Sequence, residues 1–317
     1  MDLVTVDDVR AAAVDVAGVV LRTPLLPCRW DDQLWLKPES LQPVGSFKLR
    51  GATHAVARLD PDQRIRGVVT HSSGNHGQAL AYAARAGGAL HGGDPRGCSG
   101  GKDRPGTRTR RRGTHGRPGR PAAGRTGDRR RAGRTLIPPF DDRRIIAGQG
   151  TIGLEVLADL PDVDVLLVPV GGGGLASGIA TVVRALRPGA KVIGVEPALA
   201  ADAAESLHAG ELRRWEPERT YRTSADGLRT TLSALTFAHL SARLDGIVTV
   251  TEDEIAAATT RLVRAARLVV EPSGAVATAA RMFHAAELPA GRTVAVISGG
   301  NVDPAVLVAA AGRPDAG

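Results

Sequence analysis

The sequence predicts an α/β protein in which helices cover both faces of at least one mainly parallel sheet. Two observations lead to this fold class. Short apolar segments with strand character alternate with longer segments whose apolar residues recur at helical spacing. The segment 163–170 is almost entirely apolar, which is typical of a strand buried on both faces of a parallel sheet. The length of 317 residues leaves room for two domains.

The first predicted element is a helix that begins after Thr5 and runs to about Val20. Thr5 is suited to cap this helix, and Asp8 occupies the capping-box position three residues later. The elements that follow in the first half of the chain are a strand over 33–37, a helix over 46–59, a strand over 67–70 and a helix over 78–85.

A second series of elements begins after residue 136. Apolar periodicity predicts helices over 148–160, 175–187, 254–268 and 273–287, and strands over 163–170, 191–195 and 293–297. This alternation of strand, helix and strand is the order expected of a parallel sheet.

Composition excludes several classes of protein. Hydrophobic residues make up 43% of the chain, which is too many for a disordered chain and enough for a sizeable core. The two cysteines, Cys28 and Cys98, are too few for a disulfide framework. No apolar run approaches the ~20 residues of a membrane span, and the N-terminus lacks the pattern of a secretory signal. We therefore expect a cytoplasmic protein.

The positive charge of the chain is concentrated in one segment. The chain has 41 basic and 33 acidic residues, and 88–134 alone holds thirteen Arg and one Lys against three Asp. The same segment has no Val, Ile, Met, Phe, Trp or Tyr and a single Leu. A strongly basic segment is one mark of a nucleic-acid binder, but the rest of the chain is mildly acidic. The sequence thus predicts a globular protein interrupted by a segment with almost nothing to bury.

Four consecutive glycines (171–174) join a predicted strand to the following helix. Glycines let backbone N–H groups approach an anion, and the N-terminus of a helix adds about half a positive charge. The loop therefore predicts a phosphate site, although no Lys-Ser or Lys-Thr follows it as in a P-loop, and a tight glycine turn that binds no ligand is an alternative. A dinucleotide is an alternative guest, because Gly171, Gly173 and Ala176 match G-x-G-x-x-A and Glu196 ends the next strand.

Lys48 lies near the start of the helix predicted over 46–59. The helix dipole disfavours a cation there, which lowers the pKa of the lysine and favours the neutral amine. A lysine that forms a Schiff base with a carbonyl compound requires this neutral form. A solvated surface lysine is the alternative that this segment alone leaves open.

A polar loop at 71–77, His-Ser-Ser-Gly-Asn-His-Gly, follows one predicted strand and precedes a helix. It adds hydroxyl and amide groups to a second helix N-terminus. One of Ser72 and Ser73 would be enough to cap the helix. The remaining polar residues therefore favour a binding site for a ligand carboxylate, with simple capping as the alternative.

Seven segments in this order resemble motifs of the fold-type II pyridoxal-phosphate (PLP) enzymes, in particular their threonine/serine dehydratase and serine racemase branch. The resemblance spans the whole chain except 88–134. It implies a tryptophan synthase β-like fold with two domains, each with a mainly parallel sheet flanked by helices. The segments are KPESLQP (37–43), GSFKLRGA (45–52), THSSGNHGQ (70–78), AGQGT (147–151), PVGGGG (169–174), TVTEDE (249–254) and SGGNVD (298–303).

The resemblance implies which residues surround the cofactor. Lys48 would carry PLP as a Schiff base and act as the base at the substrate α-carbon. Phe47 would lie against the cofactor ring, Asn75 would bond its phenolic oxygen and Ser298 its pyridine nitrogen. The phosphate would be held by Gly171, Gly172, Gly173 and Gly174.

The resemblance also implies a substrate site and a metal site. The substrate carboxylate would be bound by Ser72, Ser73, Gly74, Asn75 and His76. Ser73 matches the serine that, in racemases, faces the substrate from the side opposite the lysine. Mg²⁺ or another divalent cation would be held by two carboxylates and one backbone carbonyl, from Glu196, Asp202 and Ala200. A surface acid at the end of a strand is the alternative for Glu196.

The reaction implied by the resemblance is β-elimination, in which L-threonine or L-serine yields ammonia and 2-oxobutanoate or pyruvate. The expected partners are a small amino-acid substrate and a second copy of the chain, with no membrane and no nucleic acid. A serine racemase and a hydroxyaspartate-type dehydratase are the nearest alternatives. An NAD-dependent oxidoreductase built on the 171–174 loop, or a nucleic-acid binder that uses 88–134, accounts for fewer of the motifs.

The expected domains follow from the same resemblance. Residues 1–62 and 145–317 would form a large PLP-binding domain, and residues 63–144 a small domain. The segment 88–134 has about the length of the strand–helix units that it replaces. We therefore predict a pair of compensating frameshifts in a GC-rich gene, since alanine codons read one base out become Arg, Gly and Pro codons. The small domain would lack part of its sheet, and activity would be weak or absent.

Overall fold

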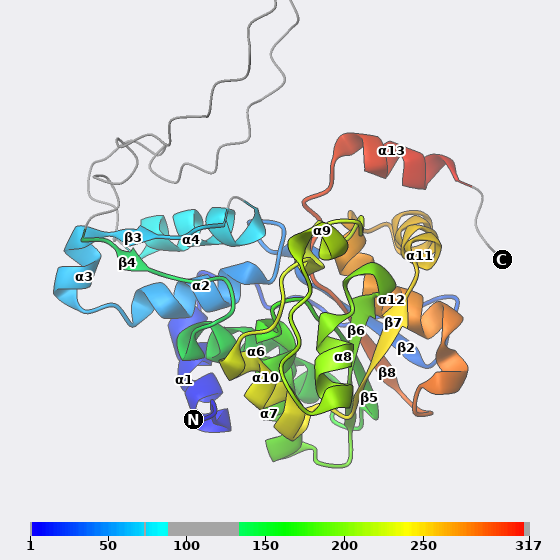
Figure 1. Cartoon of the computed structure of the whole chain (residues 1–317), viewed down its shortest axis with the longest axis horizontal. Helices are drawn as coiled ribbons and strands as arrows, with labels where there is room; N and C mark the ends of the chain where they lie inside the picture. The colour runs from blue at the N-terminus through cyan, green and yellow to red at the C-terminus, as the bar shows by residue number, and fades with distance from the viewer. Residues whose placement is uncertain (1, 73, 88–132, 314–317) are drawn as a thin grey trace, which may run out of the picture.

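A computed structural model of the chain describes residues 2–72, 74–87 and 133–313. These residues form two sheets flanked by helices, a larger one with strand order β1-β2-β8-β5-β6-β7 and a smaller one that pairs β3 with β4 (Figure 1). All neighbouring strands are parallel except β1 and β2. The predicted α/β fold class is therefore confirmed.

The strands of the larger sheet come from both halves of the chain. They are β1 (Leu26–Pro27), β2 (Leu34–Pro38), β5 (Val165–Pro169), β6 (Lys191–Pro197), β7 (Gly246–Val250) and β8 (Thr293–Ile297). Every residue of β5 and β8 is buried, as the apolar sequence of a strand covered on both faces requires.

The helices around this sheet belong mainly to the second half of the chain. They are α1 (Val6–Val16), α6 (Arg143–Asp159), α7 (Gly174–Leu186), α8 (Asp202–Ala209), α9 (Pro217–Thr220), α10 (Ala234–Arg243), α11 (Glu252–Arg264), α12 (Pro272–Phe283) and α13 (Pro304–Gly312). Short 3₁₀ turns occupy 39–41, 198–200, 226–228 and 285–287. Among the described residues, no helix has the length and apolar character needed to cross a membrane.

The hydrophobic core lies on both faces of the larger sheet. Val165 and Leu167 of β5 belong to a cluster that includes residues of α11 and α12. Leu166 and Val168 belong to a second cluster with residues of α6 and α7. Successive residues of β5 thus pack on opposite faces, which is the period of two that a strand imposes.

The smaller sheet is part of a separate small unit at one side of the molecule (Figure 1). Its elements are α2 (Lys48–Ala57), α3 (Pro61–Arg66), β3 (Val68–Val69), α4 (Asn75–Ala86) and β4 (Thr135–Leu136). Val56, Leu80 and Ile137 lie in its own hydrophobic cluster. The predicted frameshift segment lies outside the described residues apart from its last two positions, 133 and 134, and the frameshift stays a prediction.

The predicted elements are present, most of them with shifted ends. Thr5 and Asp8 form the predicted capping box, but α1 ends at Val16 because Ala17 is extended and Gly18 has a φ of +77°. The helix predicted from 148 begins at Arg143, where the side chain of Asp142 caps it. The sequence analysis did not predict the helices at 61–66, 202–209, 217–220, 234–243 and 304–312, or the strands at 26–27, 135–136 and 246–250. Several of these are too short for hydrophobic periodicity to reveal.

Candidate active site

Lys48 is the first residue of α2, and its side chain is half-buried. Its Nζ donates a hydrogen bond to the carbonyl oxygen of Pro139 at 3.1 Å and lies 4.7 Å from the centre of the Phe47 ring. Burial lowers the pKa of Lys48 to about 8, although the nearby Glu271 carboxylate opposes the shift. The expectation of a lowered pKa is thus met, with desolvation rather than the helix dipole as the main cause.

The four glycines form the turn between β5 and α7. Gly173 has a φ of +81°, a conformation that favours glycine, and it caps the N-terminus of α7. A Cβ on Gly171 would lie 2.9 Å from the Cα of Leu228, and one on Gly173 would lie 2.7 Å from a methyl of Leu232. Side chains are therefore excluded, and the loop keeps bare backbone at the positive end of a helix, which suits a phosphate.

Pro139 and Phe140 connect the lysine to the glycine loop. The carbonyl oxygen of Pro139 accepts the hydrogen bond from Lys48, and Phe140 lies directly against Gly172 and Gly174. The amine and the loop, which are far apart in sequence, thus meet on one dipeptide. The sequence analysis did not select this dipeptide, although a proline pair followed by an aromatic residue is unusual in so aromatic-poor a chain.

Ser298 lies beside the start of α2. The backbone N–H of Phe47 donates to the carbonyl oxygen of Ser298 at 3.0 Å, so the end of β8 is tied to the residue before Lys48. The Ser298 side chain is buried and donates to the carbonyl oxygen of Ser273 at 3.2 Å. The structure brings this predicted residue next to the lysine; its predicted bond to a ring nitrogen stays a prediction.

Asn75, the first residue of α4, is held by two side chains. Its Nδ2 donates to Oε1 of Glu271 at 2.8 Å, and its Oδ1 accepts from Nδ2 of Asn301 at 2.8 Å. Burial raises the pKa of Glu271 to about 7, although the Asn75 bond acts in the opposite direction. Sequence reasoning missed Glu271. A glutamate directly before the Pro-Ser-Gly that starts a helix was the available signal.

The polar loop lies at the N-terminus of α4, where the imidazole of His76 points into the core. Gly74 is the cap residue and no side chain caps the helix, so the simple capping alternative is not supported by the residues described here. His76 is only 1% exposed, and its Nε2 bonds the carbonyl oxygen of Ile137 at 3.0 Å. Burial, and then the charge of Lys48, lower the pKa of His76 to about 4. Ser73 lies outside the described residues.

Glu196 and Asp202 form a buried acidic pair between β6 and α8, and Ala200 between them is also buried. The two carboxylate oxygens of Glu196 accept the N–H groups of Ala203 and Ala204 at 3.1 and 2.7 Å. One carboxylate oxygen of Asp202 has no hydrogen-bond partner. Burial, and then Asp202, raise the pKa of Glu196 well above its ordinary value, and burial raises the pKa of Asp202 to about 6. Within the described residues, no three His, Cys, Asp or Glu side chains gather in a way that could hold a metal ion.

Comparison with known proteins places this arrangement in context. The family model described as pyridoxal-phosphate dependent enzyme matches residues 16–299. Serine racemase of Dictyostelium discoideum is 35% identical, with 96% of each chain covered, and L-threonine ammonia-lyase of Thermotoga maritima is 37% identical, covering 95% of this chain and 76% of that one. The crystal structure of serine racemase from Dictyostelium discoideum is 34% identical, with a TM-score of 0.78 and coverage of 95% and 99%. A crystal structure of a threonine deaminase is 40% identical, with a TM-score of 0.77 and coverage of 94% and 98%.

Proposed function

Because the chain belongs to the family of pyridoxal-phosphate dependent enzymes, we propose that it is an ammonia-lyase that acts on L-threonine or L-serine. The reaction removes the β-hydroxyl as water and then releases ammonia, which leaves 2-oxobutanoate or pyruvate. The observation that carries this proposal is the Lys48 amine, which is a base near neutral pH and is joined through Pro139 and Phe140 to a bare glycine loop.

The residues of the site fit pyridoxal phosphate. A neutral lysine amine is the group that reacts with an aldehyde, and Lys48 has a pKa of about 8. The glycines at 171–174 leave backbone N–H groups for the phosphate at the start of α7. We propose that Lys48 holds the cofactor through Nζ, that the glycine loop holds its phosphate, and that Phe47, Asn75 and Ser298 surround its ring.

When bound, pyridoxal phosphate withdraws electrons from the α-carbon of an attached amino acid and so acidifies the proton on that carbon. Once the substrate amine has taken the place of Lys48 on the cofactor, the free Nζ of Lys48 would take this proton. The electron pair of the broken C–H bond would form a double bond to the β-carbon as the C–O bond breaks, and Lys48 would return the proton to the hydroxyl, which leaves as water. Lys48 would then displace the unsaturated product, and after a proton moves to its β-carbon, water would replace its nitrogen, which departs as ammonia.

The loop at the start of α4 orients the substrate. Its backbone N–H groups lie at the positive end of a twelve-residue helix, which suits the substrate carboxylate. The imidazole of His76 is turned into the core, so we assign His76 a role through its backbone N–H rather than its ring. Ser72, Gly74 and Asn75 complete this site together with Ser73.

We also propose that Glu196, Asp202 and the carbonyl of Ala200 bind Mg²⁺ or a similar divalent cation. Two adjacent carboxylates in the interior need compensating positive charge, and one oxygen of Asp202 has no partner within the protein. Oxygen donors of this kind are those preferred by Mg²⁺ and Ca²⁺.

Serine racemisation is a second candidate function, favoured by the likeness to the Dictyostelium serine racemase. Racemisation needs an acid on the face of the substrate opposite Lys48, and Ser73 is the residue we assign to it.

We further propose a homodimer in the cytoplasm. Val306 and Val308 of α13 are 39% and 71% exposed, and a second copy of the chain would cover such apolar surface.

One experiment tests the proposed function. The purified chain is titrated with pyridoxal phosphate and followed by visible absorbance, and ammonia release is then measured with threonine, serine and hydroxyaspartate. We expect a visible band and slow release of ammonia from threonine or serine, because the segment 88–134 is predicted to weaken activity, while chiral analysis of residual serine reports racemisation. A chain that develops no band at saturating pyridoxal phosphate contradicts the proposal.

A further inference from the structure

The AGQGT segment at 147–151 lies in the middle of α6, and its first glycine touches α2. A Cβ added to Gly148 would lie 2.6 Å from the Cα of Gly51 and 2.7 Å from the carbonyl oxygen of Arg50. From the other side, a Cβ added to Gly51 would lie 2.9 Å from the carbonyl oxygen of Ile145. The backbones of α2 and α6 therefore touch at Gly51 and Gly148, and the backbone N–H of Gly51 donates to the side-chain oxygen of Gln149 beside this contact at 3.3 Å.

The second glycine of the segment touches a different helix. Gly150 lies two residues after Gly148, and residues in a helix are rotated by about 100° each, so the two glycines face nearly opposite sides of α6. A Cβ on Gly150 would lie 2.9 Å from the carbonyl oxygen of Gly178 in α7, and a Cβ on Gly178 would lie 2.5 Å from the nitrogen of Gly150. The backbone of α6 is thus in contact with α7 as well.

Both neighbours of α6 begin with a group that we assign to the cofactor. Lys48 is the first residue of α2, and the glycine loop leads into α7. Figure 1 shows α6 beside both helices. Two backbone contacts thus hold α6 against both the helix that begins with the lysine and the helix that follows the glycine loop.

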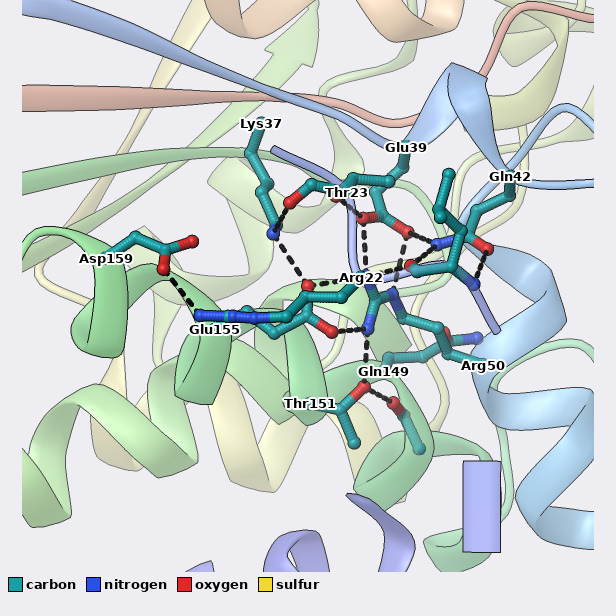
Figure 2. Close-up of polar contacts among 12 residues, drawn as sticks. Arg22, Thr23, Lys37, Glu39, Gln42, Arg50, Gln149, Thr151, Glu155 and Asp159 are labelled. Atoms are coloured by element: carbon teal, nitrogen blue, oxygen red, sulfur yellow. Dashed lines mark hydrogen bonds and ion pairs between the residues drawn. The ribbon is translucent and has the colours of Figure 1, made fainter. Parts of the chain in front are cut away.

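A buried ion cluster links α2 to α6 (Figure 2). The Arg50 guanidinium bonds both oxygens of Glu39 at 2.7 and 2.8 Å and both oxygens of Glu155, on α6, at 2.6 and 2.9 Å. Lys37 donates to the same Glu155 at 2.6 Å. Thr151, the last residue of the AGQGT segment, accepts a further bond from Arg50 at 3.1 Å. Two cations and two carboxylates compensate one another, as buried charges require.

We propose that α6 is a spacer that sets the distance between Lys48 and the glycine loop, with Gly148 and Gly150 as its contact points and Arg50 and Glu155 as positioning residues. The proposal rests on the proposed binding of pyridoxal phosphate. A ligand held at both ends gains affinity because its second contact is intramolecular, and this gain depends on correct spacing. An error in spacing therefore weakens the binding of a ligand that is held at both ends (a two-ended ligand) and leaves the binding of ligands held at one end (one-ended ligands) unchanged.

The test compares three ligands on the full chain: pyridoxal phosphate, pyridoxal and inorganic phosphate. Dissociation constants are measured for the wild type, Gly148→Ala and Glu155→Gln, with Asp159→Asn as the matched control. Asp159 lies on α6 one turn after Glu155, and its partner Arg22 is exposed. In the first two variants we expect Kd for pyridoxal phosphate to rise by about 10-fold or more, while Kd for the one-ended ligands changes by less than about 2-fold. In the control variant, Asp159→Asn, all three dissociation constants should stay at their wild-type values.

Each outcome decides the proposal. If Kd rises in parallel for all three ligands, or if pyridoxal phosphate keeps its advantage over pyridoxal in either folded variant, the spacer role is wrong. A wild type that binds pyridoxal phosphate no better than pyridoxal contradicts the proposed function itself, which separates the two failures. Circular dichroism reports folding. Should Gly148→Ala not fold, Glu155→Gln carries the test, because that substitution preserves shape and Glu155 is 16% exposed.

Discussion

The Lys48 amine is subject to two opposing effects. Burial favours the neutral amine and lowers its pKa to about 8, whereas the Glu271 carboxylate favours the ammonium form. Glu271 is itself buried, with a pKa raised to about 7, so near neutral pH it is partly protonated and attracts the lysine less. A lysine in these surroundings keeps a usable fraction of neutral amine at physiological pH.

The first prediction concerns the covalent role of Lys48. Wild-type protein incubated with pyridoxal phosphate and reduced with borohydride should gain the mass of one cofactor, and Lys48→Ala should not. Lys191→Ala is the control, since Lys191 is an exposed lysine paired with Asp245. Intact-mass spectrometry makes the measurement. Equal labelling of the wild type and Lys48→Ala would show that another amine carries the cofactor.

The second prediction concerns Glu271 and pH. Its pKa is raised from 4.5 to about 7 in the folded protein, so between these values the folded chain binds more protons than the unfolded chain. Stability should therefore fall as pH rises from 4.5 to 7, by roughly 3 kcal/mol at most for this one group. Glu271→Gln should remove this part of the slope. Urea unfolding of the cofactor-free protein at about pH 5 and about pH 7.5 measures it, and an identical slope in the variant argues against a raised pKa.

At the level of elements, each binding feature lies where a strand or helix begins or ends. Lys48 and Asn75 begin α2 and α4, the glycine loop joins β5 to α7, and Ser298 follows β8 directly. Parallel strands present their carboxyl ends at one edge of the sheet, and helices that follow them direct their N-termini to the same edge. Groups distant in sequence therefore gather there without long connections.

The third prediction tests the glycine loop. Gly173→Ala should weaken pyridoxal phosphate binding by about 10-fold or more, because its Cβ would lie 2.7 Å from Leu232 and displace the backbone at the start of α7. Gly210→Ala is the matched control. Gly210 also has a positive φ, +68°, but a Cβ there would meet nothing within 4 Å. Both variants should lose about 1 kcal/mol of stability, and only the first should lose affinity. Fluorescence titration distinguishes them.

The fourth prediction concerns the acidic pair between β6 and α8. Mg²⁺ should raise the melting temperature of the chain, because a cation that binds only the folded state stabilises it by mass action. Glu196→Gln should abolish the rise and should make the metal-free protein more stable, since one buried carboxylate is removed. Differential scanning calorimetry with and without EDTA reports both effects. A rise of the same size in the variant rules out this pair as the site.

At the scale of the whole molecule, the described residues form a large sheet with a core on both faces and a small unit with a hydrophobic cluster of its own. The described part of the small unit has a parallel pair of two-residue strands, and Ile65 and Leu136 are 75% and 54% exposed. The division into a large domain, 1–62 and 145–317, and a small domain, 63–144, stays a prediction; α2 packs against both α4 and α6.

The fifth prediction concerns the segment 88–134. Translation of its gene region in the other two frames should yield alternating apolar strands and helices, and a chain carrying that translation should release ammonia faster and melt at a higher temperature than the present one. The physical reason is that ordering each residue costs about 1–2 kcal/mol, which the single Leu of the present segment does not offset. If neither frame contains such a pattern, the basic segment is a genuine feature of the protein.

Local patterns were enough to predict most elements of the large sheet. The buried strand β8 has the predicted bounds 293–297, because the apolar residues that follow Thr293 form a short run that ends at Ser298. The capping box of α1 was also readable, since Thr5 and Asp8 lie within one helical turn. Lys48 and the 171–174 loop stood out because a lysine at a helix start and four glycines in a row both run against ordinary propensity.

Tertiary structure alone decided what surrounds those residues. Glu271, Pro139 and Phe140 contact Asn75, Lys48 and the glycine loop only because the sheet brings its strand ends together, and nothing in their local sequence records that partner. The burial that lowers the pKa values of Lys48 and His76 likewise depends on packing between distant segments. The sequence by itself determined the elements and the reactive groups, because those depend on neighbours in the chain. The distances, partners and protonation states depend on neighbours in space, and only the fold supplies them.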